Sequence, residues 1–140
     1  MELQKAFTIE EPAVSVPWGI TEAELEALIQ VPGLRRVVRA YYTLPVTVLG
    51  GLRCMLGFHF RGRSAGLSEL EFFRTAYPDQ RASFEEFQRH FERAFGPPSS
   101  TEPGDQGLPS HEWQLHGVSI IHYVFDRFGP EEHMRIRRAA

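Results

Sequence analysis

Ionisable side chains that could carry chemistry gather near the end of the chain. Two histidines and three carboxylates lie within the twelve residues from 122 to 133, which suffices in type for a divalent-metal site or for general acid–base catalysis. His122 and Asp126 are four residues apart, about 13 Å along an extended strand, so one metal ion cannot bind both. Glu131 and His133 share a strand face and could approach His122 across a hairpin. The candidate catalytic or metal-binding set is therefore His122, Glu131 and His133.

A structural role explains the same cluster without requiring its side chains to converge on one site. Asp126 and Arg127 precede the Gly129-Pro130 break, where proline interrupts a strand and polar side chains can anchor the turn. Cys54 is the only cysteine and lies in an alternating apolar run, which favours a small buried hydrophobe over a catalytic thiol. The sequence contains no Gly-x-Ser-x-Gly motif and no phosphate-binding loop. We therefore expect no catalytic residue, no metal and no cofactor, and keep the His122 set as the alternative.

Aromatic and charged side chains in the same part of the chain predict a surface that binds a partner. Trp113 stands between His111 and His116, and Tyr123 and Arg127 follow on the next predicted strand. Tryptophan, tyrosine and arginine supply much of the binding energy at protein interfaces. The predicted binding residues are Glu69, Glu71, His111, Trp113, His116, Tyr123, Asp126 and Arg127.

The two carboxylates of this set, Glu69 and Glu71, lie on one face of an earlier strand. Pairing with cations of neighbouring strands is the favoured role, and such a pair contributes a few tenths of a kcal/mol. Binding of a basic partner or substrate is the alternative role. The candidate intramolecular partners are Arg35, Arg39, Arg53 and His59.

Strands at the end of the chain must position the candidate residues. Residues 111–115 alternate apolar and polar side chains, which is typical of a strand with one buried face. His116-Gly117 has the composition of a tight hairpin turn, because glycine adopts positive φ without a steric penalty. Residues 118–128 are apolar on both faces and predict a central strand covered on both sides. Residues 132–138 alternate again, so the chain ends in an antiparallel meander.

The preceding part of the chain predicts two helices and three strands. Thr21 and Glu24 form a capping box before the first helix, and Ser83 and Glu86 form another before the second. Helical spacing turns His90 toward solvent and four phenylalanines toward the core. These are Phe84, Phe87, Phe91 and Phe95, and the strands cover residues 34–43, 52–60 and 67–74.

Two segments stay outside these elements. Residues 1–20 read as an extended N-terminal segment, in which residues 3–9 could form an edge strand, because Pro12 and Pro17 force an extended path. Residues 97–109 are rich in proline, glycine and serine and poor in apolar side chains. They predict a mobile surface loop.

The order of these elements predicts an α+β fold. Residues 21–74 and 83–138 each read as a helix followed by three strands, which predicts an αβββ pseudo-repeat. We expect a roughly six-stranded antiparallel sheet with the two helices packed on one face and the other face partly exposed. With 140 residues, 42% of them hydrophobic, the chain fits a single domain over residues 1–140.

Composition narrows the class of function. A net charge of −3 without a basic segment disfavours nucleic-acid binding, and the absence of a long apolar run or signal-peptide pattern predicts a cytoplasmic protein that does not enter a membrane. We expect a small bacterial protein of the immunity or adaptor type, which neutralises, inhibits or escorts a partner protein through its exposed sheet face. Homodimerisation stays open. A small metal-dependent or acid–base enzyme is the alternative.

Overall fold

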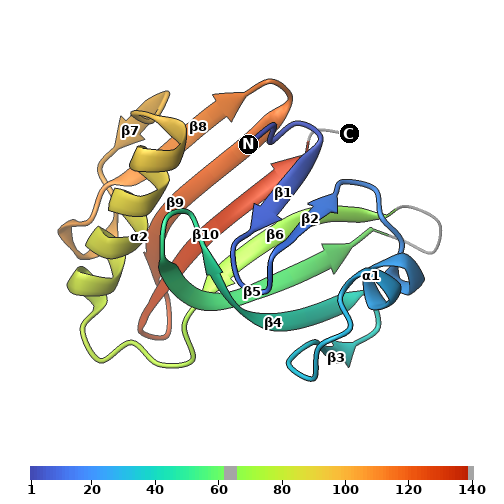
Figure 1. The fold of residues 1–140 in the computed structure, drawn as a ribbon. Helices are drawn as coiled ribbons and strands as arrows, with labels where there is room; N and C mark the ends of the chain where they lie inside the picture. Colours follow the sequence, from blue (N-terminus) through green and yellow to red (C-terminus); the bar gives the residue numbers. More distant parts are fainter. Residues whose placement is uncertain (62–65, 139–140) are drawn as a thin grey trace.

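The computed structural model describes residues 1–61 and 66–138, and these form one antiparallel sheet of eight strands beside a smaller hairpin (Figure 1). Neighbouring strands follow the order β3-β4-β5-β6-β10-β9-β8-β7. Four strands from each half of the chain therefore lie together, and the halves join where β6 pairs with β10. The strands are β3 (Arg35–Val38), β4 (Tyr41–Val48), β5 (Leu52–Phe60), β6 (Leu67–Phe73), β7 (Ser100–Glu102), β8 (Ser110–Leu115), β9 (Val118–Asp126) and β10 (Pro130–Arg138).

The large sheet has two strands more than the predicted six, and each additional strand has a local cause. The predicted strand 34–43 turns at Arg39 and Ala40, where Ala40 has a φ of 66°, so it supplies both β3 and the start of β4. The predicted mobile loop 97–109 contains β7, which pairs with β8, and the short 3-10 turn η1 (Asp105–Gly107). All three residues of β7 are exposed. An edge strand held by backbone hydrogen bonds needs no apolar side chains, so composition alone did not reveal it.

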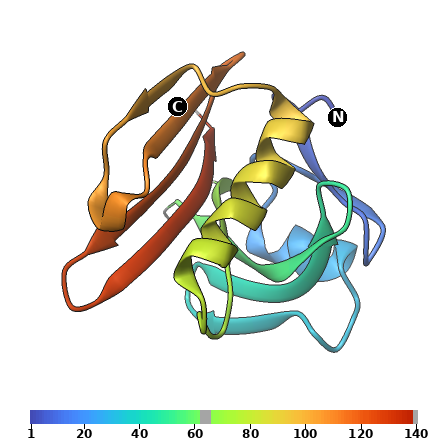
Figure 2. The ribbon, with the colours of Figure 1, turned by 90° about the vertical axis from the view of Figure 1, so that its left-hand side faces the viewer.

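Three elements cover one face of this sheet. They are the hairpin of β1 (Ala6–Ile9) and β2 (Val14–Pro17), the helix α1 (Glu22–Leu28) and the longer helix α2 (Gln80–Phe95). The sheet curves around them, as Figures 1 and 2 show. The expectation of two helices on one face is confirmed, but the N-terminal segment that we read as extended folds into a two-stranded sheet of its own.

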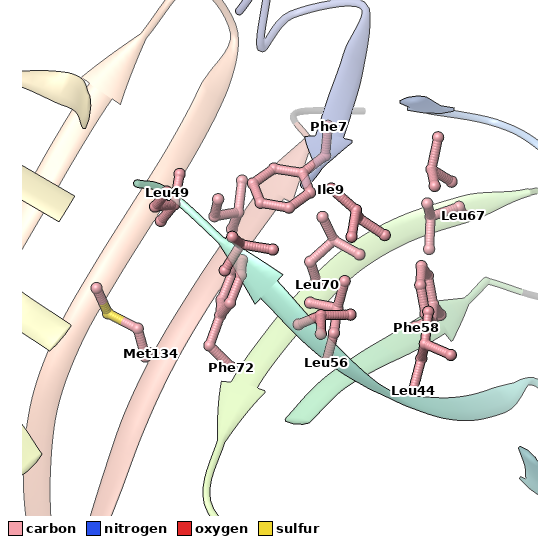
Figure 3. Packing of buried hydrophobic residues seen from close by; sticks show 14 of the residues in the cluster. Phe7, Ile9, Leu44, Leu49, Leu56, Phe58, Leu67, Leu70, Phe72 and Met134 are labelled. Carbon is pink, nitrogen blue, oxygen red and sulfur yellow. The ribbon is translucent and has the colours of Figure 1, made fainter. Parts of the chain in front are cut away.

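A single large core lies between the sheet and this covering layer. Phe7 of the hairpin meets Phe72 of β6 with ring centroids 5.5 Å apart (Figure 3), and Phe72 meets Phe91 of α2 with centroids 5.2 Å apart. All three rings are at most 1% exposed, and truncation of such a side chain to alanine costs about 3 to 5 kcal/mol. The same cluster contains Trp18 and Trp113, one from each half of the chain.

The two helices begin differently. Thr21 and Glu24 form the predicted capping box of α1, with both reciprocal hydrogen bonds present. The predicted second box is wrong, because Asp79 caps α2 by accepting a hydrogen bond from the Ala82 amide at 3.0 Å. Ser83 therefore lies inside the helix, where its hydroxyl is available for a tertiary contact.

The expectation that His90 lies in solvent is also wrong. His90 is only 8% exposed, and its Nδ1 donates to the carbonyl oxygen of Leu49 at 2.8 Å. Leu49 belongs to the turn between β4 and β5 and has a φ of 48°. This turn covers a side of α2 that helical spacing alone assigned to water, whereas Phe91 is fully buried as predicted.

Candidate binding surface

The face of the sheet opposite to α1, α2 and the hairpin is open, since no helix or strand of the described residues packs on it (Figure 2). Side chains from alternate positions of five strands form it, while the intervening side chains fill the core. We call this surface the outer face. It comprises Tyr41, His59, Glu69, Glu71, Ile121, Tyr123, Phe125, His133, Arg135 and Arg137.

Charged side chains in the middle of the outer face pair with one another across β5, β6 and β10. Glu71 accepts hydrogen bonds from His59 Nε2 at 2.9 Å and from Arg135 Nη2 at 3.2 Å. Arg135 also contacts Glu69 at 2.5 Å, and Arg137 pairs with Glu69 as well. Above all, the hydrogen bond from His59 holds the pKa of Glu71 below its ordinary value.

This network bears on the role of the two predicted carboxylates. His59 was one of the expected intramolecular partners, but Arg135 and Arg137 of β10 take the place of Arg35, Arg39 and Arg53. Cations of the chain itself therefore surround Glu69 and Glu71. The arrangement favours cross-strand ion pairing over the capture of a basic partner.

Tyr41 extends the network toward the β3 edge of the sheet. Its ring stacks on His59 with centroids 4.6 Å apart and an interplanar angle of 26°. A Cβ atom on Gly57 would lie 3.0 Å from the Tyr41 ring and 3.2 Å from Glu71 Oε1, so glycine gives these groups room to meet above β5. Burial, and then the charge of Glu71, raise the pKa of Tyr41.

Exposed aromatic side chains mark the other end of the outer face, at the turn between β9 and β10. Phe125 is 43% exposed and Phe128 is 88% exposed. The guanidinium of Arg127 lies 5.9 Å from the first ring centroid and 5.2 Å from the second, within the range of a cation–π interaction. Tyr123 stacks on His133 beside them, with centroids 4.8 Å apart.

The apolar outer side of β9 also corrects an expectation. Residues 118–128 predicted a strand covered on both faces, but only the side with Val118, Ile120 and Val124 is buried. Ile121 and Tyr123 on the other side are half-buried within the open sheet surface. The apolar side chains of this face are therefore available for contact.

The predicted binding residues divide between several places. Tyr123, Glu69 and Glu71 lie on the outer face, and Arg127 lies at its β9–β10 end. Trp113 points into the core, is 0% exposed, and donates from Nε1 to the Gly96 carbonyl oxygen at 2.9 Å. It therefore cannot anchor a partner in the folded protein, and the prediction for this residue is wrong.

The remaining three predicted binding residues do not lie on the outer face either. His111 shares the core side of β8 with Trp113 and bonds to Thr101 at 3.0 Å. His116 forms the hairpin turn with a φ of 47°. The Asp126 carboxylate accepts from the Gln106 side chain, and the Asp126 backbone amide donates to the Asp105 carboxylate at 2.9 Å, so Asp126 connects η1 to β9.

The candidate catalytic set does not assemble. His122 lies on the core side of β9 and is 0% exposed. Glu131 and His133 lie on the opposite side of β10, 3.6 Å from each other. Within residues 1–61 and 66–138, no three His, Cys, Asp or Glu side chains come together in a way that could hold a metal ion.

His122 instead joins a buried polar network under α2. Its Nε2 lies 2.5 Å from Glu132 Oε2, and its Nδ1 lies 2.8 Å from the Gln88 side chain. The other oxygen of Glu132 accepts from Ser83 at 2.8 Å and from Gln80 at 3.1 Å. Burial lowers the pKa of His122, although its hydrogen bond to Glu132 opposes this effect.

The Gln88 side chain closes one side of this network. Its Oε1 faces His122 Nδ1 at 2.8 Å, whereas its buried Nε2 has no hydrogen-bond partner among the described residues. Side-chain oxygens therefore lie at both ring nitrogens of His122. Sequence reasoning missed Glu132, although it shares the inward phase of Met134 and Ile136 on β10.

An open groove runs between α2 and the segment before β8, but it does not reach His122. Phe84, Gln88, Leu108 and His111 line it, and its volume is about 540 Å³. The Phe84 ring stacks on His122 with centroids 4.0 Å apart. The imidazole is thus sealed behind the groove wall, and its network serves to hold α2 on β9 and β10.

Comparisons of the chain with protein-family models, with curated proteins and with solved structures find no match. In the part of the chain that the structure describes, no helix combines the length and apolar character needed to cross a membrane.

Proposed function

We propose that this protein acts by binding another protein through the outer face, and that it neutralises, inhibits or escorts that partner. The observation that carries the proposal is the open sheet face with the Phe125, Arg127 and Phe128 cluster at its end. A phenylalanine side chain left 88% exposed forfeits the stabilisation that burial brings. A partner that covers it recovers this stabilisation.

The outer face has the composition that protein interfaces use. Aromatic rings and an arginine lie at one end, where they can serve as anchors. Beside them the Glu69, Glu71, Arg135 and Arg137 network supplies a polar surface whose charges are already paired. These ion pairs already hold the side chains in place before a partner binds. Binding therefore costs this protein less side-chain conformational entropy.

We also infer that the outer face is built from two related units. Each unit consists of a helix followed by four strands, α1 with β3 to β6 and α2 with β7 to β10. Their last strands meet at the centre of the sheet, with Glu69 opposite Arg137 and Glu71 opposite Arg135. Element order and sheet order support this pseudo-repeat, with one strand more per unit than the αβββ pattern.

The proposed function is tested on the protein purified untagged from its own host under gentle conditions. Native mass spectrometry and metal analysis are made on one sample. We expect a stoichiometric second polypeptide. The double variant Arg127→Ala/Phe128→Ala should weaken that complex at least about thirtyfold, because truncation of even one hot-spot residue costs about 2 kcal/mol or more.

The matched control is Arg81→Ala/Arg89→Ala, which removes exposed charge from α2 on the other side of the sheet. This variant should keep the partner. A complex that survives the loss of Arg127 and Phe128 would contradict the outer face as the contact. A lone chain that carries one equivalent of a divalent metal would instead favour the metal-dependent enzyme.

A further inference from the structure

The β3 edge of the large sheet is a second surface that the outer-face contact does not use. β3 pairs only with β4, and no other strand of the described residues lies along its free side (Figure 1). Its four residues, Arg35, Arg36, Val37 and Val38, are all exposed. A strand with a free side presents unpaired backbone N–H and C=O groups that can hydrogen-bond to another extended chain.

Exposed apolar side chains concentrate at this edge. Seven large hydrophobic side chains are exposed among the described residues, and four of them lie between positions 28 and 38. Val37 is 48% exposed and Val38 is 61% exposed. Leu28 and Val31, at the end of α1 and just beyond it, complete the group. Exposed aliphatic side chains weaken the protection that charges and the register shift between Arg36 and Val38 give to this sheet edge.

The same edge is positively charged within a chain of net charge −3. Arg35, Arg36 and Arg39 lie within five residues. Arg36 is 3.6 Å from Glu22 of α1. Neither Arg35 nor Arg39 forms an ion pair with any residue that the structure describes. Two guanidinium groups are therefore available to a partner beside the free backbone groups.

This charge decides between two occupants of the edge. Antiparallel pairing of β3 with a second copy would bring Arg35 and Arg36 of one copy, with Arg39 of the turn that follows, close to the same three arginines of the other. Like charges that meet across a strand pair destabilise it. An extended segment with carboxylates at alternate positions complements the same edge.

We propose that the β3 edge accepts an extended acidic segment of a partner protein as an additional strand of the sheet. Backbone hydrogen bonds to β3 supply the part of the affinity that does not depend on the sequence of the segment. Carboxylates that reach Arg35 and Arg39 supply the selectivity for acidic segments. Apolar residues between these carboxylates cover Val37 and Val38. The site does not depend on the outer-face contact, and it would stand if that proposal failed.

To test this proposal, a capped synthetic peptide of alternating Glu and Val is titrated into the ¹⁵N-labelled full chain, and binding is monitored by NMR. A peptide of about seven residues is long enough for one strand. We expect chemical-shift changes at residues 34–43, slower exchange of the β3 amides, and affinity that falls as salt screens the charges. Arg35→Glu/Arg39→Glu should weaken binding at least about tenfold, since both contacts become repulsive.

Three controls separate strand addition from simple charge attraction. Arg81→Glu/Arg89→Glu makes the same charge change on α2 and should bind the peptide like the unchanged protein. The charge-reversed peptide of alternating Lys and Val should not bind. The acidic peptide with N-methyl groups on alternate residues keeps its charge but loses backbone donors, and should bind at least about tenfold more weakly.

The proposal is overturned by any of three results. These are shift changes centred away from β3, equal weakening by the β3 and α2 charge reversals, or full binding of the N-methylated peptide. Far-UV circular dichroism checks that the variants are folded. Self-association of the chain that Arg35→Glu/Arg39→Glu abolishes would assign the edge to a second copy instead.

Discussion

At the scale of single residues, His90 and Glu132 show what decides the position of a polar side chain. Helical spacing places His90 on a side of α2 that a turn from another part of the chain then covers. Glu132 is buried because its strand phase points inward, and His122, Ser83 and Gln80 supply the hydrogen bonds that permit this. Both residues are buried with partners that lie far away in the sequence.

His90→Ala should therefore lower the free energy of unfolding by about 1 to 3 kcal/mol, since it leaves the buried Leu49 carbonyl without its donor. Phe91→Ala should lower it by about 3 to 5 kcal/mol. Urea midpoints with a shared slope measure both changes. The control is Arg89→Ala, an exposed residue of the same helix, which should stay within about 0.5 kcal/mol. Equal effects of His90→Ala and Arg89→Ala would show that the Leu49 contact does not matter.

At the scale of elements, ion pairs on the outer face connect strands from the two halves of the chain. Glu71 of β6 accepts from His59 of β5 and from Arg135 of β10. Because the native pKa of Glu71 lies below its ordinary value of 4.5, the unfolded chain binds more protons than the native protein between these two pKa values. The contribution of Glu71 to stability is thus complete above 4.5 and is lost as pH falls through the native pKa.

Acid unfolding should report this contribution. Glu71→Gln should destabilise the protein near neutral pH and should reduce the loss of stability as pH falls below 4.5. The urea midpoint measured at a series of pH values tests this. Glu85→Gln, at an exposed position of α2 outside the ion pairs formed by the described residues, should leave the pH profile unchanged. If the urea midpoint fell equally steeply with decreasing pH in Glu71→Gln and in the unchanged protein, the proposed contribution of Glu71 to acid unfolding would be contradicted.

At the scale of the whole molecule, the two halves share one core. Trp18 comes from the end of the β1–β2 hairpin and Trp113 from β8, yet both belong to one cluster of buried side chains. β6 and β10 join the two sets of strands through a continuous register. Neither half can then lose its packing without exposing apolar surface of the other, so the chain should unfold as one unit.

Single-tryptophan proteins test this expectation. Trp18→Phe leaves Trp113 as the reporter for the second half, and Trp113→Phe leaves Trp18 for the first. Within each variant, the urea transition seen by fluorescence should coincide with that seen by far-UV circular dichroism. Separate midpoints within one variant would mean that the halves are independently stable.

The sequence by itself determined the local structure of this protein. The capping box at Thr21, the alternation in β5, β6 and β8, the His116-Gly117 turn and the burial of Phe91 follow from nearest neighbours along the chain. Only the tertiary structure decided which polar residues meet. It separated His122 from Glu131 and His133, buried Trp113, and left the outer face and the β3 edge open. Periodicity tells which side chains share a face, but what covers that face depends on segments distant in sequence.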